Sequence, residues 1–195
     1  MRFFKIGFQG TLVVMVIVFL FFGMIKNGFT ASVKITQGRL FVNGESFIIK
    51  GAGYSPVPIG IDPETTPPFG DYFTSNFSPI YERDLPLLRQ MGANTIRILY
   101  WNNDADHSDF LDKAYNNGIN PIYVIVTFPV NPNHYPDISS TEAREKIKAD
   151  FRAMVSAYKN HPALLMWSIG DELNSPRMYG DRLLDIFRLI NELAY

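Results

Sequence analysis

Short apolar segments alternate with segments of helical spacing along most of this chain, and this alternation limits its fold more than any other feature. The strand-like segments are largely apolar, as strands are when a parallel sheet buries them on both faces. They lie at residues 94–99, 121–126 and 164–169. Apolar residues recur at helical spacing between and after them, at residues 84–91, 110–115, 147–158 and from 183 onward. Strands and helices in this order predict a parallel α/β architecture.

A β-hairpin is predicted before the alternation begins. Asn43-Gly44 separates the apolar runs 39–42 and 46–50. Asn-Gly is the strongest short hairpin signal, because both residues accept a positive φ. The second run continues into 51–54, which is expected to end the first strand of the parallel sheet. Residues 55–78 form a long loop, and loops of this length inside a compact domain are usually functional or disordered.

Capping residues predict where two of the helices begin. Asp84 is expected to N-cap a helix that runs through Met91, because its carboxylate can accept from the free amides of the first turn. Ser139 and Glu142 have the spacing of a capping box ahead of the helix at 147–158.

Composition excludes several classes of site. The 195 residues have a formal net charge of −1 and are 47% hydrophobic, which indicates a globular core and gives no electrostatic basis for binding nucleic acid. The absence of cysteine excludes disulfides, zinc–thiolate sites and thiol nucleophiles. The histidines, His107, His134 and His161, lack the spacing of metal ligands.

The N-terminus is predicted to contact a membrane. No charge lies between Lys5 and Lys26, and these roughly 20 residues span about 30 Å as a helix. The run is longer than the apolar region of a signal peptide, so an uncleaved anchor with an extracytoplasmic domain is expected; secretion after cleavage is the alternative. Arg2 and Lys5 place positive charge on the cytoplasmic side. The expected organisation is an anchor, a linker and an exported domain, at residues 1–26, 27–33 and 34–195.

Two carboxylates mark the candidate active site. Asp171 and Glu172 follow the strand at 164–169 directly after Gly170. In a barrel of parallel strands, side chains at the C-terminal strand ends face the active site. A carboxylate that emerges from an apolar strand is expected to be partly desolvated, which favours the protonated form that a general acid needs. The alternative is an ordinary acidic loop.

Three ordered segments together resemble the retaining glycoside hydrolases that have a (β/α)8 barrel. Residues 39–51 resemble the entry hairpin and first strand of these enzymes, residues 84–98 their first helix and second strand, and residues 158–172 their fourth strand and acid/base. The nearest families are the glycoside hydrolase family 2 catalytic barrel and the family 72 glucanosyltransferases. A full barrel has eight strands in about 250 residues. The expected fold is therefore the N-terminal half of a barrel, with about four βα units, preceded by the hairpin and a transmembrane segment.

The resemblance implies roles for individual residues. Glu172 matches the general acid/base, and Arg97 matches the second-strand arginine that holds the nucleophile carboxylate; a structural salt bridge is the alternative for Arg97. Asp171 stands where the family usually has an asparagine that contacts the sugar 2-hydroxyl, and it is expected to be protonated or to mark a site that has drifted. Aromatic residues near strand ends can stack on sugars or simply pack, and here they are Tyr54, Tyr100, Trp101 and Trp167.

The implied function is hydrolysis or transfer of β-linked glycans by double displacement, on an oligosaccharide or polysaccharide substrate and with no metal or cofactor. Retaining chemistry needs two carboxyl groups about 5–5.5 Å apart. The family nucleophile ends the seventh strand, and no acidic residue of this chain matches it. One alternative is a non-catalytic, membrane-anchored glycan-binding or interaction module, whose open strand edges and apolar helix faces would favour association. A different (β/α)8 enzyme or an unrelated α/β membrane protein is the third reading.

Overall fold

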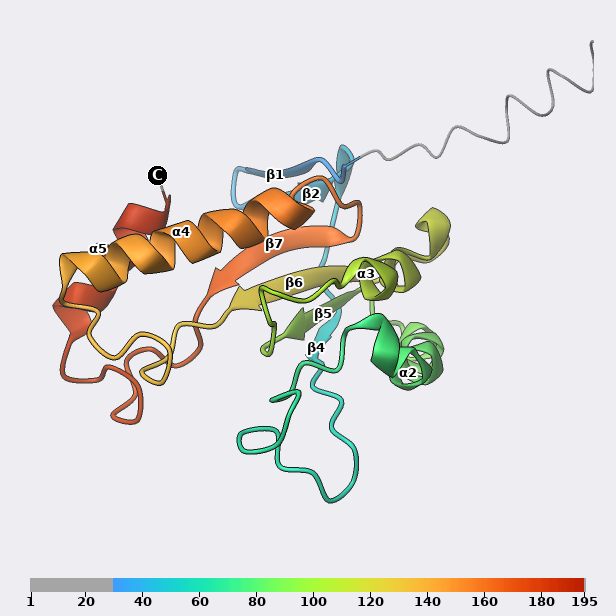
Figure 1. Cartoon of the computed structure of the whole chain (residues 1–195). Coiled ribbons are helices and arrows are strands. Elements are labelled where there is room, and N and C mark those ends of the chain that lie inside the picture. Colours follow the sequence, from blue (N-terminus) through green and yellow to red (C-terminus); the bar gives the residue numbers. More distant parts are fainter. Residues whose placement is uncertain (1–29, 195) are drawn as a thin grey trace, which may run out of the picture.

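The computed structural model describes residues 30–194, which form two β-sheets and four α-helices (Figure 1). The strands are β1 (Val33–Thr36), β2 (Arg39–Val42), β3 (Glu45–Ser46), β4 (Gly51–Gly53), β5 (Thr95–Ile98), β6 (Tyr123–Phe128) and β7 (Leu164–Ile169). The helices are α2 (Ser78–Gln90), α3 (Ser108–Tyr115), α4 (Thr141–Tyr158) and α5 (Leu183–Ala194), with short 3-10 turns η1 (Ser75–Phe77) and η2 (Asn116–Gly118). The predicted anchor at residues 1–26 lies outside the described residues. Within 30–194, no helix combines the length and apolarity needed to cross a bilayer.

The predicted hairpin is confirmed as part of a three-stranded antiparallel sheet in the order β1-β2-β3. Asn43 and Gly44 have φ of 54° and 85°, the positive values that the tight turn between β2 and β3 requires. A second two-residue turn, Gln37-Gly38, joins β1 to β2 with φ of 50° and 72°. The arm after Asn43-Gly44 is shorter than predicted, because only two residues of β3 pair with β2.

The parallel α/β prediction is also confirmed. Strands β4, β5, β6 and β7 form a four-stranded sheet in sequence order, and every neighbouring pair is parallel. Strand β6 begins two residues later than predicted. Pro121 has no N–H to donate, and the Ile122 amide bonds to the Ala114 carbonyl at the end of α3 instead of the sheet.

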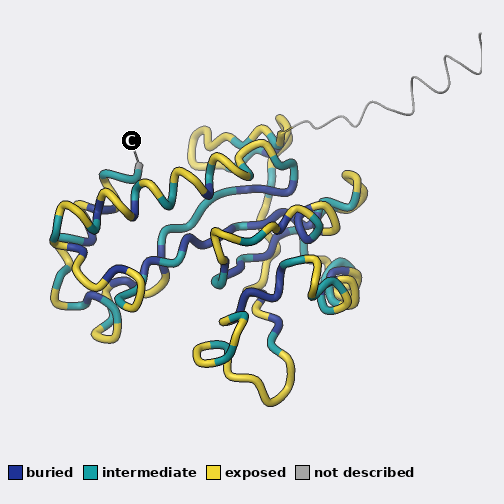
Figure 2. Tube along the Cα trace, in the orientation of Figure 1, coloured by how far each residue is buried: buried dark blue, intermediate teal, exposed yellow. Residues whose placement is uncertain are grey.

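The two faces of the parallel sheet differ in chemistry. The face toward the helices is apolar and its side chains are buried, including Ile96, Ile98, Val124, Val126 and Phe128. Burying such a side chain stabilises the fold by about 1.5–3 kcal/mol. The opposite face is covered near the N-terminal strand ends by the hairpin sheet, in a second cluster built on Val42, Tyr123 and Leu165. Figure 2 shows strand β6 buried along most of its length, whereas the surfaces of the helices that face solvent are exposed.

Helix α2 begins seven residues earlier than predicted, with Phe77 and not Asp84 at the N-cap position. Pro79 occupies the first turn, where its missing N–H costs nothing, and the helix continues through Pro86 to Gln90. Asp84 is therefore inside the helix and does not cap it. Its carboxylate accepts from the Tyr54 hydroxyl at 3.0 Å and from Arg83 Nε at 2.7 Å.

The predicted capping box on α4 is wrong by one residue. Ser140 is the N-cap, and its hydroxyl accepts from the Ala143 amide at 3.1 Å. The Ser139 hydroxyl donates to Asp137 instead. Since the residue three positions after Ser140 is alanine, the reciprocal half of a capping box is missing.

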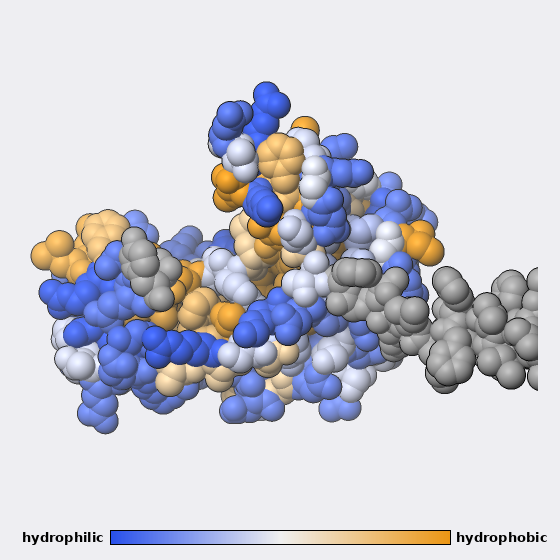
Figure 3. All heavy atoms as spheres, turned by 90° about the horizontal axis from the view of Figure 1, so that it is seen from above, coloured by the Kyte–Doolittle hydropathy of each residue, from blue (hydrophilic) through white to orange (hydrophobic). Residues whose placement is uncertain are grey.

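Helix α5 exposes an apolar face. Leu183, Leu184, Phe187 and Ile190 are 45%, 80%, 59% and 38% exposed. Figure 3 shows apolar side chains gathered at the left end of the molecule, where α5 lies in Figure 1. An open apolar helix face is what the alternative of a non-catalytic interaction module predicts.

Candidate active site

The candidate site lies where the parallel strands end. The loops that leave these strands are residues 54–77, 99–107, 129–140 and 170–182. Because parallel strands share one direction, all four loops begin at the same edge of the sheet. The predicted arginine and both predicted carboxylates lie at this edge.

Arg97 is fixed across three strands on the sheet face that points away from the helices. Its Nε lies 3.3 Å from Thr127 Oγ1 on β6, and its Nη2 lies 3.3 Å from Ser168 Oγ on β7. Nη2 also lies 3.4 Å from the Gly170 carbonyl and 2.9 Å from Asp171 Oδ1. The guanidinium is therefore held in one orientation at the end of the sheet, as a group that positions carboxylates should be.

The carboxylate that Arg97 holds, among the described residues, belongs to Asp171. The side chains of this pair are 38% and 46% exposed, so the ion pair contributes at most about 1 kcal/mol to stability. The ion pair joins the turn after β7 to strand β5 through side chains. Protonation of Asp171 stays a prediction.

Glu172 sits on a strained turn that Gly170 makes possible. Gly170 has a φ of 61°, and a Cβ added there would lie 2.5 Å from a Leu173 methyl group. Glu172 itself has a φ of 46°, in the left-handed region that non-glycine residues rarely adopt. This conformation costs of order 1–2 kcal/mol, and such strain concentrates at functional sites. The turn is closed by the Ser175 amide, which donates to the Glu172 carbonyl at 2.7 Å.

The prediction that these carboxylates are partly desolvated is wrong, and the turn at Gly170 is the reason. Both Asp171 and Glu172 are exposed, since the chain turns away from the strand before either side chain begins. The apolar residues of β7 thus place the carboxylates without enclosing them.

The two tryptophans pack rather than line the site. Trp167 pairs with Val126 on the neighbouring strand and packs against the helix-facing core. Trp101 is only 4% exposed; its indole stacks on His107 at 3.7 Å and meets Tyr158 edge-on at 5.3 Å. Neither ring is brought to Arg97, and the packing alternative fits both.

Tyr54 is likewise buried. Its amide donates to the Arg97 carbonyl, its ring packs on Phe73, and its hydroxyl donates to Asp84 on α2. Burial, and next the hydrogen bond to Asp84, raise the pKa of the Tyr54 hydroxyl well above its usual range. Tyr54 therefore ties the end of β4 to helix α2.

Tyr100 is the aromatic residue whose hydroxyl is influenced by Asp171 and by two carboxylates of the loop after β4. Burial raises the pKa of its hydroxyl, and so do the neighbouring charges of Glu64, Asp62 and Asp171. Its ring lies so close over Gly70 that a Cβ at that position would overlap it. Tyr100 is half-buried.

A buried pair, Asp71 and His107, was missed from the sequence. His107 Nε2 lies 2.9 Å and 3.1 Å from the two Asp71 carboxylate oxygens. The residues are 36 positions apart and belong to two different loops. No local pattern marks such a pair, because its partners meet only when both loops fold.

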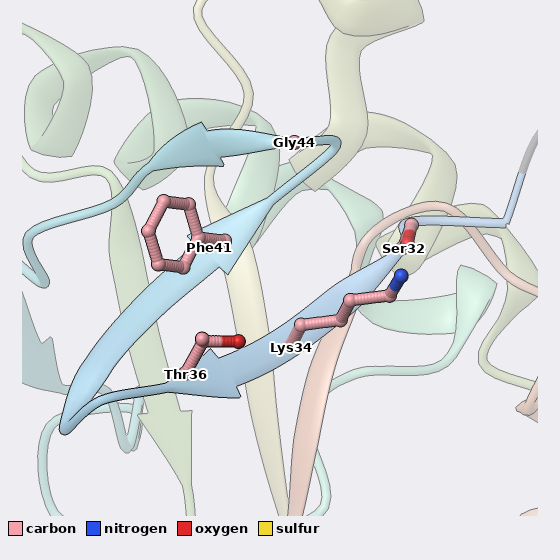
Figure 4. Close-up of a pocket in the computed structure, with 5 residues that line it drawn as sticks. All are labelled: Ser32, Lys34, Thr36, Phe41 and Gly44. Carbon is pink, nitrogen blue, oxygen red and sulfur yellow. The ribbon is translucent and has the colours of Figure 1, made fainter.

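A pocket lies elsewhere on the molecule. It is lined by residues of the hairpin sheet, Ser32, Lys34, Thr36, Phe41 and Gly44 (Figure 4). The hairpin sheet packs on the N-terminal ends of β6 and β7, so this pocket is remote from the carboxylates. Within residues 30–194, no group of three or more His, Asp or Glu side chains is placed to hold a metal ion.

Comparison with known proteins identifies the family. A family model described as glucanosyltransferase, glycoside hydrolase family 72, matches residues 24–179. A 1,3-beta-glucanosyltransferase of Saccharomyces cerevisiae, GAS5, is 34% identical over 97 residues, or 48% of this chain and 18% of that protein. The Schizosaccharomyces pombe gas5 is 29% identical over 151 residues, or 74% of this chain and 26% of that protein. This chain thus spans about a quarter or less of these relatives' length.

A solved structure shows the same fold. A crystal structure of ScGas2 in complex with a compound superposes with a TM-score of 0.51 at 23% identity, over 71% of this chain and 30% of that one. Since the family model covers most of the chain, the chain belongs to the glycoside hydrolase family 72 glucanosyltransferases.

Proposed function

We propose that this chain supplies the acid/base side of an active site that cleaves or transfers β-linked glucans, with Glu172 as the general acid/base. The main support is the geometry at the end of β7. Glu172 follows a buried parallel strand on a strained left-handed turn, and its neighbour Asp171 pairs with Arg97 at 2.9 Å. Strain of this kind persists only where the surrounding structure holds it, which is typical of functional positions.

In the proposed reaction, Glu172 moves one proton in each of two steps. First, its carboxyl group donates a proton to the departing glycosidic oxygen while a second carboxylate bonds to the anomeric carbon and the glycosidic bond breaks. Then Glu172 takes a proton from water or a sugar hydroxyl, whose oxygen attacks the anomeric carbon and releases the carboxylate. That second carboxylate is outside the positions of this chain that match the family.

Asp171 is proposed to contact the substrate as an acceptor. An asparagine at this position could donate a hydrogen bond to the sugar, whereas a carboxylate paired with Arg97 can only accept one. Arg97 is proposed to orient Asp171, because four hydrogen bonds fix its guanidinium. The site therefore favours a glycan that presents a hydroxyl donor at this point.

The proposed substrate is a β-1,3-linked glucan, as the names of the yeast relatives suggest. The proposed setting is outside the cytoplasm, held by the anchor predicted at residues 1–26 or secreted after its cleavage.

A second function, glycan binding without turnover, is favoured by one observation. Arg97, the residue that matches the nucleophile's partner in the family, is already engaged by Asp171. A site of this kind would bind β-glucan and leave it intact.

One experiment separates these functions. The full-length protein is titrated with a β-1,3-linked glucose tetrasaccharide by calorimetry, and the mixture is then analysed for shorter and longer products by mass spectrometry. The enzyme proposal predicts products that Glu172→Gln reduces by at least about 100-fold. Binding without products would support the binding module, and the absence of binding would refute both.

A further inference from the structure

Behind the proposed site lies a buried carboxylate–imidazole pair that no step of the proposed reaction uses. Asp71 is 3% exposed and His107 is fully buried. Asp71 belongs to the loop after β4, residues 54–77, and His107 ends the loop after β5, residues 99–107. These are two of the loops that begin at the site edge of the sheet.

The Asp71 carboxylate joins the two loops through several hydrogen bonds. It accepts from the Asn102 amide at 2.9 Å, from the Phe73 amide at 3.4 Å and from His107 Nε2 at 2.9 Å. Because Nε2 faces two carboxylate oxygens, the ring proton belongs on this nitrogen. The pair thus closes a contact between the loop after β4 and both ends of the loop after β5.

His107 is itself held from the other side. Its ring stacks on Trp101 at 3.7 Å with an interplanar angle of 23°. Its amide donates to the Tyr158 hydroxyl at 3.1 Å, and that hydroxyl donates to the Ala105 carbonyl at 3.2 Å. Since Tyr158 is the last residue of α4, these hydrogen bonds fix the loop after β5 to a long helix independently of Asp71.

Tyr100 is connected to the Asp71–His107 pair through the neighbouring residues Trp101 and Gly70. Tyr100 precedes Trp101, whose ring stacks on His107, and its own ring covers Gly70, the residue before Asp71. The same loop as Asp71 brings Asp62 and Glu64 next to the Tyr100 hydroxyl. Displacing Asp71 would therefore displace the surroundings of Tyr100.

We propose that the Asp71–His107 pair is a positioning device that holds Tyr100 and the loop after β4 at the edge of the sheet where Asp171 and Glu172 lie, so that both shape the glycan-binding surface. This inference rests on the proposed function, and it assigns to that site two positioning residues that do not touch the substrate. A purely structural pair would lower stability without changing the affinity of the folded protein for glycan.

The test uses two substitutions of His107 in the full chain. His107→Leu removes the donor to Asp71, whereas His107→Gln keeps an Nε2–H donor in a similar place. We expect His107→Leu to weaken binding of the β-1,3-linked glucose tetrasaccharide about tenfold. It should also speed amide hydrogen exchange in residues 62–73 while leaving exchange in α4 unchanged. His107→Gln should restore affinity to within about threefold of wild type.

Leu165→Ala is the matched control, because it removes buried contacts at the opposite end of the sheet. It should lower the melting temperature without changing glycan affinity. If His107→Leu does not fold, Asp71→Asn replaces it with the same expected loss of affinity. A folded variant with faster loop exchange and unchanged affinity would overturn the positioning role alone. A wild-type protein that binds no tetrasaccharide would overturn the proposed function and this inference with it.

Discussion

The two ends of the parallel sheet are built from the same strands but differ in burial, charge and backbone strain. At the N-terminal end, the hairpin sheet covers Tyr123 and Leu165 in an apolar cluster. At the C-terminal end, Arg97 and Asp171 are partly exposed, and Glu172 has a strained backbone. The same strand can therefore stabilise the fold at one end and carry the candidate active site at the other, because its two ends have different neighbours.

The largest loss of stability is expected at the N-terminal end of the sheet, which the hairpin sheet covers. Leu165 is 4% exposed, so Leu165→Ala should leave a cavity and lower the free energy of unfolding by about 2–5 kcal/mol. Leu184→Ala removes the same atoms from a side chain that is 80% exposed, and should change stability by less than about 0.5 kcal/mol. Urea denaturation measures both. Equal losses for the two variants would show that packing under the hairpin sheet adds nothing to the stability that Leu165 contributes.

A smaller loss is expected at Gly170, where the open end begins. Gly170→Ala places a Cβ at positive φ and against Leu173, and should cost about 1–3 kcal/mol. Gly44→Ala is the matched control, because Gly44 has a φ of 85° with no atom within 4 Å of an added Cβ. The difference between the two variants in thermal unfolding isolates the contact with Leu173. A larger loss at Gly44 would contradict the tight turn.

Replacing Glu172, whose backbone is strained, should not lower the free energy of unfolding. Glu172→Gly relieves a φ of 46° and removes only exposed atoms, so it should be neutral or stabilise the protein by up to about 1 kcal/mol. The same variant should lose any turnover of β-glucan. Calorimetric melting together with the product assay measures both. Clear destabilisation would mean that the Glu172 side chain supports the fold.

The smallest effect is a pH dependence at the start of β7. Burial lowers the pKa of His161, against the weaker influence of Asp112. The unfolded chain therefore binds more protons near and below pH 6.5, and stability should fall as pH drops through this range. His161→Gln should flatten the curve of melting temperature between pH 7.5 and about 5.5. An unchanged curve would assign the pH dependence to another group.

Much of the fold could be predicted because it depends on local pattern. The Asn43-Gly44 turn, the strands at 94–99 and 164–169 and the helical stripe at 147–158 were all found from spacing and turn chemistry. Helix starts were less predictable. Asp84 and Ser139 both have the right chemistry for a cap, but each bonds to another partner. Asp84 accepts from the distant Tyr54 hydroxyl, and Ser139 donates to Asp137 two residues away.

The site was predictable in part. Arg97 and Asp171 were named from the resemblance, and they meet at 2.9 Å. Tyr54, Trp101 and Trp167 were expected near strand ends, and the structure packs all three into the core, since an aromatic ring at a strand end can face either side of the sheet. Exposure of both carboxylates was also unforeseen, because it follows from the turn at Gly170.

The sequence by itself determined the order of strands and helices, the family, and the position of Glu172 at a strand end, because these depend on residues that are close together in the chain. Only the tertiary structure decided that Arg97 binds Asp171, that Asp71 meets His107, and that the Tyr100 ring covers Gly70. Each of these contacts joins residues from different βα units, and long-range pairing is set by packing of the whole sheet and not by local spacing.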